Sequence, residues 1–508
     1  MYKQKGILFL LITELVIFVC TVNAQQNTIP HIMKNNERKQ LIVHDQPWLL
    51  LAGELNNSSS SSKKYMEPKW DKLKAMNLNA VLAAVSWEMI EPEEDDFDFS
   101  IVDQLITGAR EHDIKLVILW FGTWKNSGST YPPIWVRQNT DRFPRAQIID
   151  LQNVDKEPEA ENLKVLIKQF PELEGRASKN LNIISPFSEE AKKADAKAFA
   201  RLMAHIKEVD ETENTVIAVQ VENEIGVRKL PRDYSTKANE KFQEMVPGRL
   251  MQFLQKNRER LVPEFLDIWA KSDFKTTGTW VEIFGTDASE IFMAWYYANY
   301  IETVAAAGKK EYPLPMFVNA WLNNPTLTPN IPGRYPSGGP IAKMFPVYLA
   351  AAPSIDFLAP DIYRPDFVYA SQLFKRMDNV LFIPETRSRG NVHANAFYAF
   401  AEDAVCFSPF GTDNVGQEDS LKITRAYGLL SKLIPTILEY QGTEKMHGIL
   451  IPAGENQVFD VGNYKIKVEA FNNREIPAYG ILINQNEDTY MVIGEGFKRQ
   501  QIRLMMGA

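Results

Sequence analysis

Cysteine and histidine are scarce in this chain of 508 residues, and acidic residues outnumber basic ones. It contains 2 cysteines, Cys20 and Cys406, and Cys20 lies in an N-terminal apolar segment. No disulfide is therefore expected, and stability must come from a large hydrophobic core. The formal net charge is −8 and no basic stripe occurs, which argues against a nucleic-acid partner.

Motifs of several enzyme classes are also missing. The 6 histidines show no H-E-x-x-H or other paired spacing, so no metal site is expected. No G-x-S-x-G motif of a serine hydrolase is present, and no G-x-G-x-x-G or P-loop turn for phosphates. The sequence therefore predicts no cofactor.

Long apolar runs are confined to the N-terminus, where ILFLLITELVIFVC follows Lys3 and Lys5. Val22-Asn23-Ala24 then offers a small-residue cleavage site. We expect residues 1–24 to be a signal peptide and the protein to be exported, to the periplasm or outside the cell. The run is short for a membrane span, so the mature form should not be membrane-bound, although a retained anchor is the alternative.

Eight short apolar runs are present, and they alternate with longer amphipathic or polar stretches. Strands that are apolar throughout are typical of a parallel sheet covered by helices on both faces. Eight such units over some 400 residues predict an α/β fold, a (β/α)8 TIM barrel with inserted helices and loops. The runs are 48–55, 78–87, 115–122, 215–224, 314–321, 355–363, 379–385 and 404–411.

Helices are predicted at 67–77, 102–112, 188–209 and 421–440, with an aromatic-rich insertion of helices and loops at 228–312. After residue 443, short alternating runs separated by Asn and Gly turns predict a small antiparallel β domain. The expected organisation is thus a signal peptide (1–24), a catalytic barrel (25–442) and a C-terminal β domain (443–508).

Carboxylates, amides and tryptophans gather where the predicted strands end. In a barrel of this type the active site lies at the C-terminal ends of the strands, so these side chains should meet. The strand-end residues include Glu54, Trp87, Lys125, Asn126, Glu222, Asn223, Glu224, Asn319, Trp321, Asp361, Tyr363 and Glu385.

The stretch VQVENEIG, residues 219–226, holds two of these glutamates. Strict alternation places Ile217, Val219 and Val221 against the helices and points Glu222 and Glu224 toward the barrel axis. Glu224 lies nearer the mouth and is the candidate for chemistry. Glu222, one layer deeper, is expected to pair with an arginine or lysine as structural support.

A retaining glycosidase needs a second carboxyl about 5–5.5 Å from the first. Glu385, in FIPETR, is the best partner, because it ends an apolar strand and alternation with Leu381 and Ile383 aims it inward. A strand-end glutamate alone is weak evidence, since most such residues form ion pairs. The pair Glu224 and Glu385 on the fourth and seventh strands predicts a glycosidase.

Several segments resemble the barrels of clan A glycosidases, and most closely glycoside hydrolase family 35. They are VENEIG, NLNAVLAAVSWEMIEPEEDDFDFS and the strand-end Glu385, with GELNNSSSSS, WFGTWKNS and CFSPFG similar to a bacterial branch of β-galactosidases. The resemblance covers roughly residues 38–500. It implies a retaining, exo-acting β-galactosidase that acts on β-galactoside oligosaccharides or polysaccharide side chains.

Carried over by position, the resemblance implies that Glu224 is the acid/base, Glu385 the nucleophile and Asn223 the ligand of the sugar 2-hydroxyl. The role of Asn223 conflicts with strict alternation, so a bulge or twist is expected there. Tyr363 is expected to donate a hydrogen bond to the nucleophile. Further pocket candidates are Glu54, Trp87, Lys125, Asn126 and Trp321.

One segment departs from the family pattern: GTWKNSG follows the third strand, where a galactose-gripping segment like G-P-Y-I-C-A-E-W is usual. Galactose preference is therefore inferred from the bacterial branch alone. Two alternatives stay open, a retaining β-glycosidase of another sugar specificity and a carbohydrate-binding barrel without activity. The second has no reason to keep both Glu224 and Glu385.

Overall fold

The computed structural model describes residues 28–35, 38–174, 180–326, 328–462, 464–473, 475–486, 489–498 and 503–506. The predicted signal peptide and Cys20 lie outside these residues. In the described part of the chain no helix is both long and apolar enough to span a membrane.

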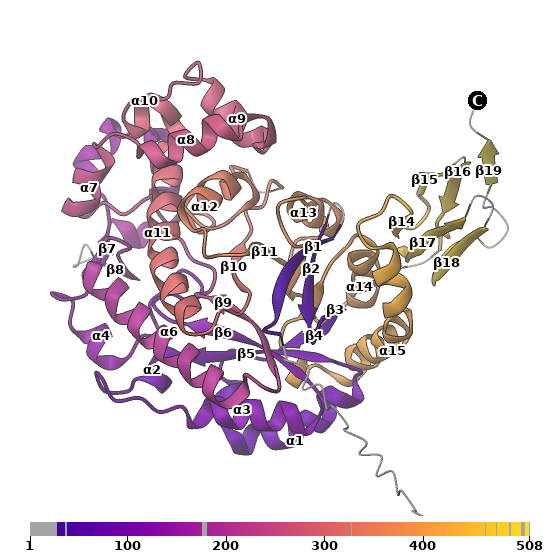
Figure 1. The fold of residues 1–508 in the computed structure, drawn as a ribbon. Helices are drawn as coiled ribbons and strands as arrows, with labels where there is room; N and C mark the ends of the chain where they lie inside the picture. The colour runs from indigo at the N-terminus through magenta and orange to yellow at the C-terminus, as the bar shows by residue number, and fades with distance from the viewer. Residues whose placement is uncertain are drawn as a thin grey trace, which may run out of the picture.

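Eight parallel strands close into a barrel, as the sequence predicts (Figure 1). Each of the eight apolar runs contains one strand. The strands are β4 (Leu50–Glu54), β5 (Ala80–Ser86), β6 (Lys115–Phe121), β9 (Val216–Val221), β10 (Met316–Trp321), β11 (Phe357–Ile362), β12 (Phe382–Thr386) and β13 (Cys406–Pro409), and β13 pairs with β4 to close the ring.

Helices surround the barrel and cover the outward faces of its strands (Figure 1). The four predicted helices are present, as α1, α3, α6 and α15. The α-helices are α1 (Lys63–Ala75), α2 (Trp87–Ile90), α3 (Ser100–Glu111), α4 (Ile134–Gln138), α5 (Ala160–Gln169), α6 (Glu189–Asp210), α7 (Thr236–Phe242), α8 (Gly248–Lys256), α9 (Pro263–Ala270), α10 (Trp280–Phe284), α11 (Ala288–Glu311), α12 (Phe345–Ala351), α13 (Phe367–Phe374), α14 (Val392–Ala401) and α15 (Gln417–Tyr440).

The predicted insertion at 228–312 is helical: it forms α7 to α10 and then the long α11. Short 3-10 turns occur elsewhere, at Ser59–Ser61, Leu151–Lys156, Pro171–Leu173, Arg258–Arg260, Gly285–Asp287, Ala342–Met344 and Thr412–Asn414.

Two groups of strands outside the barrel are not apparent from the apolar runs. An antiparallel sheet of β1 (His31–Asn35), β2 (Arg38–Val43) and β3 (Gln46–Trp48) precedes the barrel, and a two-stranded sheet of β7 (Arg145–Gln147) and β8 (Asn180–Ile184) follows β6. Leu41 and Val43 of β2 pack with the apolar residues inside the barrel, so the first sheet covers the end of the barrel where the parallel strands begin. These strands are short and mixed in polarity, which leaves little periodic signal.

Apolar side chains fill the lower part of the barrel. Phe317, Phe357 and Phe382, at or near the beginnings of their strands, pack with ring centroids 4.7–5.3 Å apart. The interior is therefore a packed core below the site, and only the upper end, at the strand termini, is polar.

The chain after α15 forms two antiparallel sheets, β14-β17-β18 and β15-β16-β19. This agrees with the expected antiparallel strands, and adds β15 and β19 to those predicted. The strands are β14 (Met446–Ile451), β15 (Asn456–Val461), β16 (Tyr464–Glu469), β17 (Ala478–Asn486), β18 (Thr489–Glu495) and β19 (Arg503–Met506).

The first of these sheets packs directly on α14. The Gly448 N–H of β14 donates to Glu402 Oε1 at 2.8 Å, and the rings of Phe397 and Tyr479 lie 5.4 Å apart. A side chain at Gly448 would place its Cβ 2.7 Å from the Tyr398 ring, so close approach of the sheet to α14 requires a glycine here.

Close packing between α6 and α11 supports the barrel at β9 and β10, the strands that follow these helices. Gly308 of α11 lies against Phe199 of α6, and a Cβ at this position would lie 2.3 Å from the Phe199 ring. We therefore expect Gly308→Leu to lower the free energy of unfolding by about 1–3 kcal/mol through overpacking. Urea unfolding measures the change. Ala306→Leu is the matched control, because Ala306 is exposed on the same helix and should be neutral; equal effects would contradict the packing argument.

Candidate active site

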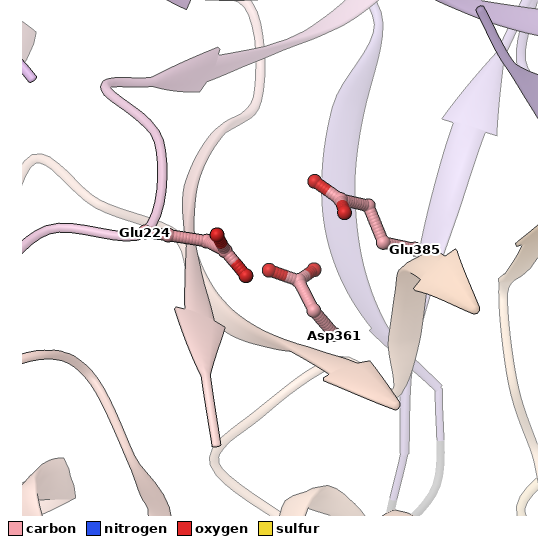
Figure 2. A group of neighbouring side chains, drawn as sticks. All are labelled: Glu224, Asp361 and Glu385. Atoms are coloured by element: carbon pink, nitrogen blue, oxygen red, sulfur yellow. The ribbon is translucent and has the colours of Figure 1, made fainter. Parts of the chain in front are cut away.

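Three carboxyl groups meet at the C-terminal end of the barrel (Figure 2). Glu224 lies just after β9, Asp361 lies on β11 and Glu385 lies on β12. Oxygen atoms of the three groups lie within 4.8 Å of one another, and all three side chains are buried. The predicted pair Glu224 and Glu385 is thus brought together, with Asp361 beside both.

The backbone after β9 departs from strand geometry. Glu222 and Glu224 have φ values of 63° and 44°, in the left-handed region. Such conformations are costly for residues other than glycine and concentrate at functional sites. The expected twist at this strand end is therefore present, and it turns Asn223 as well as Glu224 toward the barrel axis.

The prediction that Glu222 points toward the axis is wrong. Its carboxyl lies on the outer side of the barrel and accepts hydrogen bonds from the backbone N–H groups of Thr123 (3.0 Å) and Trp124 (2.6 Å). Its neighbour is Asp195 of α6, not the arginine or lysine expected. The positive φ at Glu222 is the reason, because it reverses the alternation that the strand would otherwise continue.

Alternation also fails in the strands themselves. Val219 and Val221 face the helices as predicted. Ile217 instead packs inside the barrel, because the pairing of β9 with β6 shifts register at this point and β9 contains one extra residue. Leu381 and Ile383 face the helices, contrary to the prediction. Glu385 nevertheless points inward, since the pairing of β12 with β13 is irregular between residues 383 and 386.

The pair Glu222 and Asp195 supports the loop that follows β6. Asp195 accepts hydrogen bonds from Trp120 Nε1 at 2.9 Å and from the Thr123 hydroxyl at 2.8 Å. Burial and the Asp195 charge raise the pKa of Glu222 well above its usual range. A Cβ at Gly122 would lie 2.7 Å from Glu222 and 2.8 Å from Asp195, so only glycine fits beside the pair.

The supported loop carries two predicted pocket residues. Lys125 Nζ donates to Asn223 Oδ1 at 3.0 Å, and Asn126 Nδ2 donates to Glu224 Oε2 at 2.8 Å. Asn126 also has a positive φ of 51°. GTWKNSG thus places a cation and an amide beside the carboxyl groups.

Glu385 is held by two neutral donors. Tyr363 donates its hydroxyl to Glu385 Oε2 at 2.9 Å, as the sequence predicts, and Asn223 Nδ2 donates to Oε1 at 3.3 Å. The nearby Glu385 charge and burial raise the pKa of Tyr363, so the phenol keeps its proton. These bonds orient the Glu385 carboxylate and stabilise its negative charge.

Glu224 is in a different electrostatic environment. Burial raises the pKa of Glu224, the adjacent Glu385 charge raises it further, and the value is about 8. The Lys125 and Arg228 charges oppose this shift. Glu224 is therefore protonated at neutral pH, as a general acid must be.

Asp361 is the functional residue that sequence reasoning did not select. Asn319 Nδ2 donates to Asp361 Oδ2 at 2.7 Å, and the same amide accepts from the Glu224 backbone N–H at 2.9 Å. Burial and the charges of Glu385 and Glu224 raise the pKa of Asp361 well above its usual range. Its place at the end of a predicted strand was the available signal.

Glu54 also lies at the top of the barrel interior, on β4. It is buried, and in the described part of the chain neither carboxyl oxygen has a hydrogen-bond partner. Burial and the Glu385 charge raise the pKa of Glu54 well above its usual range. An unpaired, buried carboxyl near the pocket is suited to binding a sugar hydroxyl.

The two predicted tryptophans have different places. Trp87 is buried outside the barrel, where its Nε1 donates to Glu91 Oε2 at 2.8 Å, so it is not a pocket residue. The β5 strand has already ended at Ser86, and Trp87 begins α2. Trp321 does line the pocket, and the Arg228 guanidinium lies 4.3 Å from its ring centroid.

A cavity of about 580 Å³ opens above the three carboxyl groups. It suits a ligand of one or a few sugar rings. Its lining residues, from β6, β9, β10, β11 and β12 ends and neighbouring loops, include Asn57, Lys125, Asn126, Glu224, Trp321, Tyr335, Asp361, Tyr363, Arg364, Glu385 and Arg387.

Glu224, Asp361 and Glu385 are the residues that could bind a metal ion, since three carboxylates offer the oxygen ligands that divalent cations prefer. Donors of hydrogen bonds, however, already contact both oxygens of Glu385 and one of Glu224. Their pairing with amide and phenol donors fits proton transfer better than cation binding.

Comparisons with known families identify two segments of the chain. Residues 57–157 match the family model described as β-galactosidase, that of glycoside hydrolase family 42. Residues 423–501 match a domain of unknown function (DUF5597), which begins within α15. The matched model is that of family 42 and not of family 35, and it covers residues 57–157 alone. The matched segment includes Lys125 and Asn126.

A comparison with curated protein sequences gives no match. Among solved structures, β-galactosidases from Bacillus circulans sp. alkalophilus, G. stearothermophilus and Marinomonas ef1 match at 14%, 12% and 11% identity, with TM-scores of 0.48, 0.49 and 0.49. The matches cover 77%, 80% and 79% of this chain and 57%, 58% and 62% of theirs, so this chain spans less than two thirds of those proteins.

Removal of the Glu222 carboxyl should destabilise the protein. Glu222→Ala leaves the buried N–H groups of Thr123 and Trp124 without an acceptor, and one such group costs about 1–3 kcal/mol. We expect urea unfolding to show at least this loss. Glu208→Ala, on the exposed face of α6, is the control and should change the free energy of unfolding little. A wild-type stability for Glu222→Ala would contradict the supporting role.

Proposed function

We propose that the protein is a retaining, exo-acting β-galactosidase with Glu224 as acid/base and Glu385 as nucleophile. One observation carries the proposal: two carboxyl groups have oxygens within 4.8 Å of each other, yet they lie in different electrostatic environments. Retaining glycosidases use two carboxyls about 5–5.5 Å apart, whereas inverting enzymes need a wider gap for water. The pocket at the barrel mouth suits removal of a terminal sugar.

In the first step, Glu224 donates its proton to the glycosidic oxygen while a Glu385 oxygen attacks the anomeric carbon. The bond to the leaving group breaks, and a glycosyl-enzyme ester forms on Glu385. In the second step, the Glu224 carboxylate takes a proton from water, and the water oxygen attacks the same carbon. The ester bond breaks, and Glu385 becomes a carboxylate again.

The environments of the two groups support these separate roles. A pKa of about 8 keeps the proton on Glu224 before the first step. Once Glu385 is esterified, its charge is gone, and the pKa of Glu224 should fall toward that of a base. The hydrogen bonds from Tyr363 and Asn223 hold the Glu385 carboxylate ready to attack.

Asn223 is the proposed ligand of the sugar 2-hydroxyl, because its amide lies between Lys125 and Glu385. Lys125 and Asn126 supply further donors, and Trp321 supplies an apolar face. Burial and the neighbouring carboxylate charges raise the pKa of Asp361 and of Glu54, and both are proposed as further partners of sugar hydroxyl groups. Galactose is the proposed sugar because the matched model is that of β-galactosidases.

The finer family assignment and the location of the protein are also proposals. The VENEIG segment and Glu385 support family 35, and residues 57–157 support family 42. We further propose the predicted signal peptide (1–24), export from the cytoplasm, a barrel over 25–442 and a β domain over 443–508. An exported enzyme of this type would trim galactosyl side chains from plant polysaccharide fragments.

A panel of 4-nitrophenyl α- and β-glycosides tests the activity, with lactose, galactosylated xyloglucan and arabinogalactan as natural substrates. We expect the β-galactoside to be cleaved fastest, with β-galactose as the first product by NMR. Faster cleavage of another β-glycoside would change the sugar assignment, and no cleavage would favour a binding barrel.

The roles of the two glutamates predict different mutant kinetics. Glu224→Ala should lower kcat/KM for lactose by about 10²–10⁴-fold, the usual contribution of general acid catalysis. It should lower kcat/KM for 4-nitrophenyl β-galactoside much less, because nitrophenolate leaves without a proton. Glu385→Ala should abolish both reactions, and added azide should then yield α-galactosyl azide. Wild-type turnover by Glu385→Ala would refute the nucleophile.

The pKa of Glu224 predicts a basic limit to activity. The acid must be protonated in the free enzyme, so kcat/KM should fall as the pH rises through about 8. Lys125 lowers this pKa, so Lys125→Met should move the fall to higher pH, and Lys125→Arg should leave it in place. A pH profile of kcat/KM checks both variants. If the fall in kcat/KM of Lys125→Met moved to lower pH, Glu224 would be excluded as the group whose deprotonation causes it.

A further inference from the structure

A second cavity lies next to the catalytic pocket, between the barrel and the C-terminal β strands. It has a volume of about 1140 Å³, and we call it the outer groove. The groove and the pocket share four lining residues, Tyr363, Arg364, Pro365 and Arg387, so the two spaces adjoin at these residues. Most of its other lining residues come from α13, from the loop after β12 and from the segments that follow β14 and precede β17.

The two walls of the outer groove are held at a fixed separation. One wall is α13, and the other includes residues at the end of β14 and just before β17. The β14-β17-β18 sheet is anchored to α14 through Gly448, Glu402 and the Phe397–Tyr479 ring contact. In Figure 1, the C-terminal strands lie beside α13 and α14 on one side of the barrel.

The junction of pocket and groove is also rigid. Arg364 donates to both oxygens of Asp366, at 2.9 and 2.5 Å, and to the Asn323 backbone oxygen at 2.6 Å. Its guanidinium lies 5.7 Å from the centroid of the Tyr369 ring. Tyr363, which donates to Glu385, lines both spaces, so a sugar bound at Glu385 lies next to the groove.

The lining of the outer groove has the composition of a carbohydrate site. Tyr369 is 54% exposed, and this large an aromatic surface offers a face on which a sugar ring can stack. Arg387, Arg389 and Asn391 are exposed and provide hydrogen-bond donors. Asp366 and Glu475 offset much of the arginine charge, so the lining favours a neutral chain over an acidic one.

We propose that the outer groove binds the neutral oligosaccharide that carries the terminal galactosyl residue. The inference rests on the proposed function, because it places the galactosyl residue at Glu224 and Glu385. It assigns the C-terminal β strands a role in substrate binding, as one wall of the groove. A branched or extended chain, and not a disaccharide, is then the substrate that occupies both the pocket and the outer groove.

The test compares a short and a long substrate on the full chain. Tyr369→Ala should lower kcat/KM about ten-fold for an oligosaccharide cut from galactosylated xyloglucan, the effect of losing about 1.4 kcal/mol of binding. Its kcat/KM for 4-nitrophenyl β-galactoside, which fills the pocket alone, should change less than about two-fold. Met245→Ala is the matched control, since Met245 is 56% exposed and lies outside the groove.

A second variant fills the groove with a large side chain, whereas Tyr369→Ala removes the ring on which a sugar would stack. Ala453→Trp should impair cleavage of the oligosaccharide and leave the aryl galactoside unaffected. The proposal is overturned if either variant changes both substrates equally, or if neither variant affects the oligosaccharide.

Binding separates this proposal from the proposed function. Isothermal titration calorimetry of the same oligosaccharide into Glu385→Gln, with and without Tyr369→Ala, measures the contribution of the groove to binding without turnover. If the wild type cleaves no galactoside but Tyr369→Ala weakens binding about ten-fold, the function fails and the groove stands. If cleavage occurs but binding is unchanged by Tyr369→Ala, the groove fails and the function stands.

Discussion

The two hydrogen bonds from the Thr123 and Trp124 N–H groups to Glu222 are the constraint on which the site depends. They join the ends of β6 and β9, and they require the Glu222 side chain to turn away from the barrel axis. The left-handed backbone that achieves this turns Asn223 and Glu224 inward. One buried carboxyl outside the barrel therefore positions two residues inside it, together with Lys125 and Asn126 on the joined loop.

Crowding of carboxyl groups supplies the electrostatics of the pocket. Glu54, Glu224, Asp361 and Glu385 lie close together and are buried, and burial, together with repulsion from the neighbouring carboxylate charges, raises the pKa of the first three. Four charges in this space would destabilise the fold, so protons must be retained. Burial and charge repulsion among these carboxyl groups therefore both lower the stability of the fold and favour retention of a proton.

The two halves of the binding region arise from different parts of the fold. Strand ends and the loop after β6 form the pocket, where donors are fixed within hydrogen-bond distance of the reacting groups. The outer groove is wider and forms only because the β14-β17-β18 sheet packs on α14. This division fits a substrate whose terminal sugar must be recognised closely and whose remaining chain can be bound more loosely.

Strand positions were predictable because the strands of a parallel barrel are buried on both faces. Continuous apolar runs mark such strands, and all eight runs contain one. The ends of these runs correctly indicated Glu224, Glu385, Asn223, Tyr363, Lys125, Asn126, Trp321 and Glu54 as residues near the barrel mouth. Trp87 was wrong because α2 begins immediately after β5, and the short strands β1 to β3 carried too little periodicity to be predicted.

The residues at the strand ends are predictable from the amino-acid sequence, because burial on both faces imposes a local pattern of residue types. The direction in which those residues point depends on contacts that exist only in the folded barrel. Register shifts near Ile217 and Glu385 and the positive φ values at Glu222 and Glu224 each change a side chain from one face to the other. Such shifts depend on the neighbouring strand and on partners such as Asp195, which lie far away in the sequence and leave no local signal.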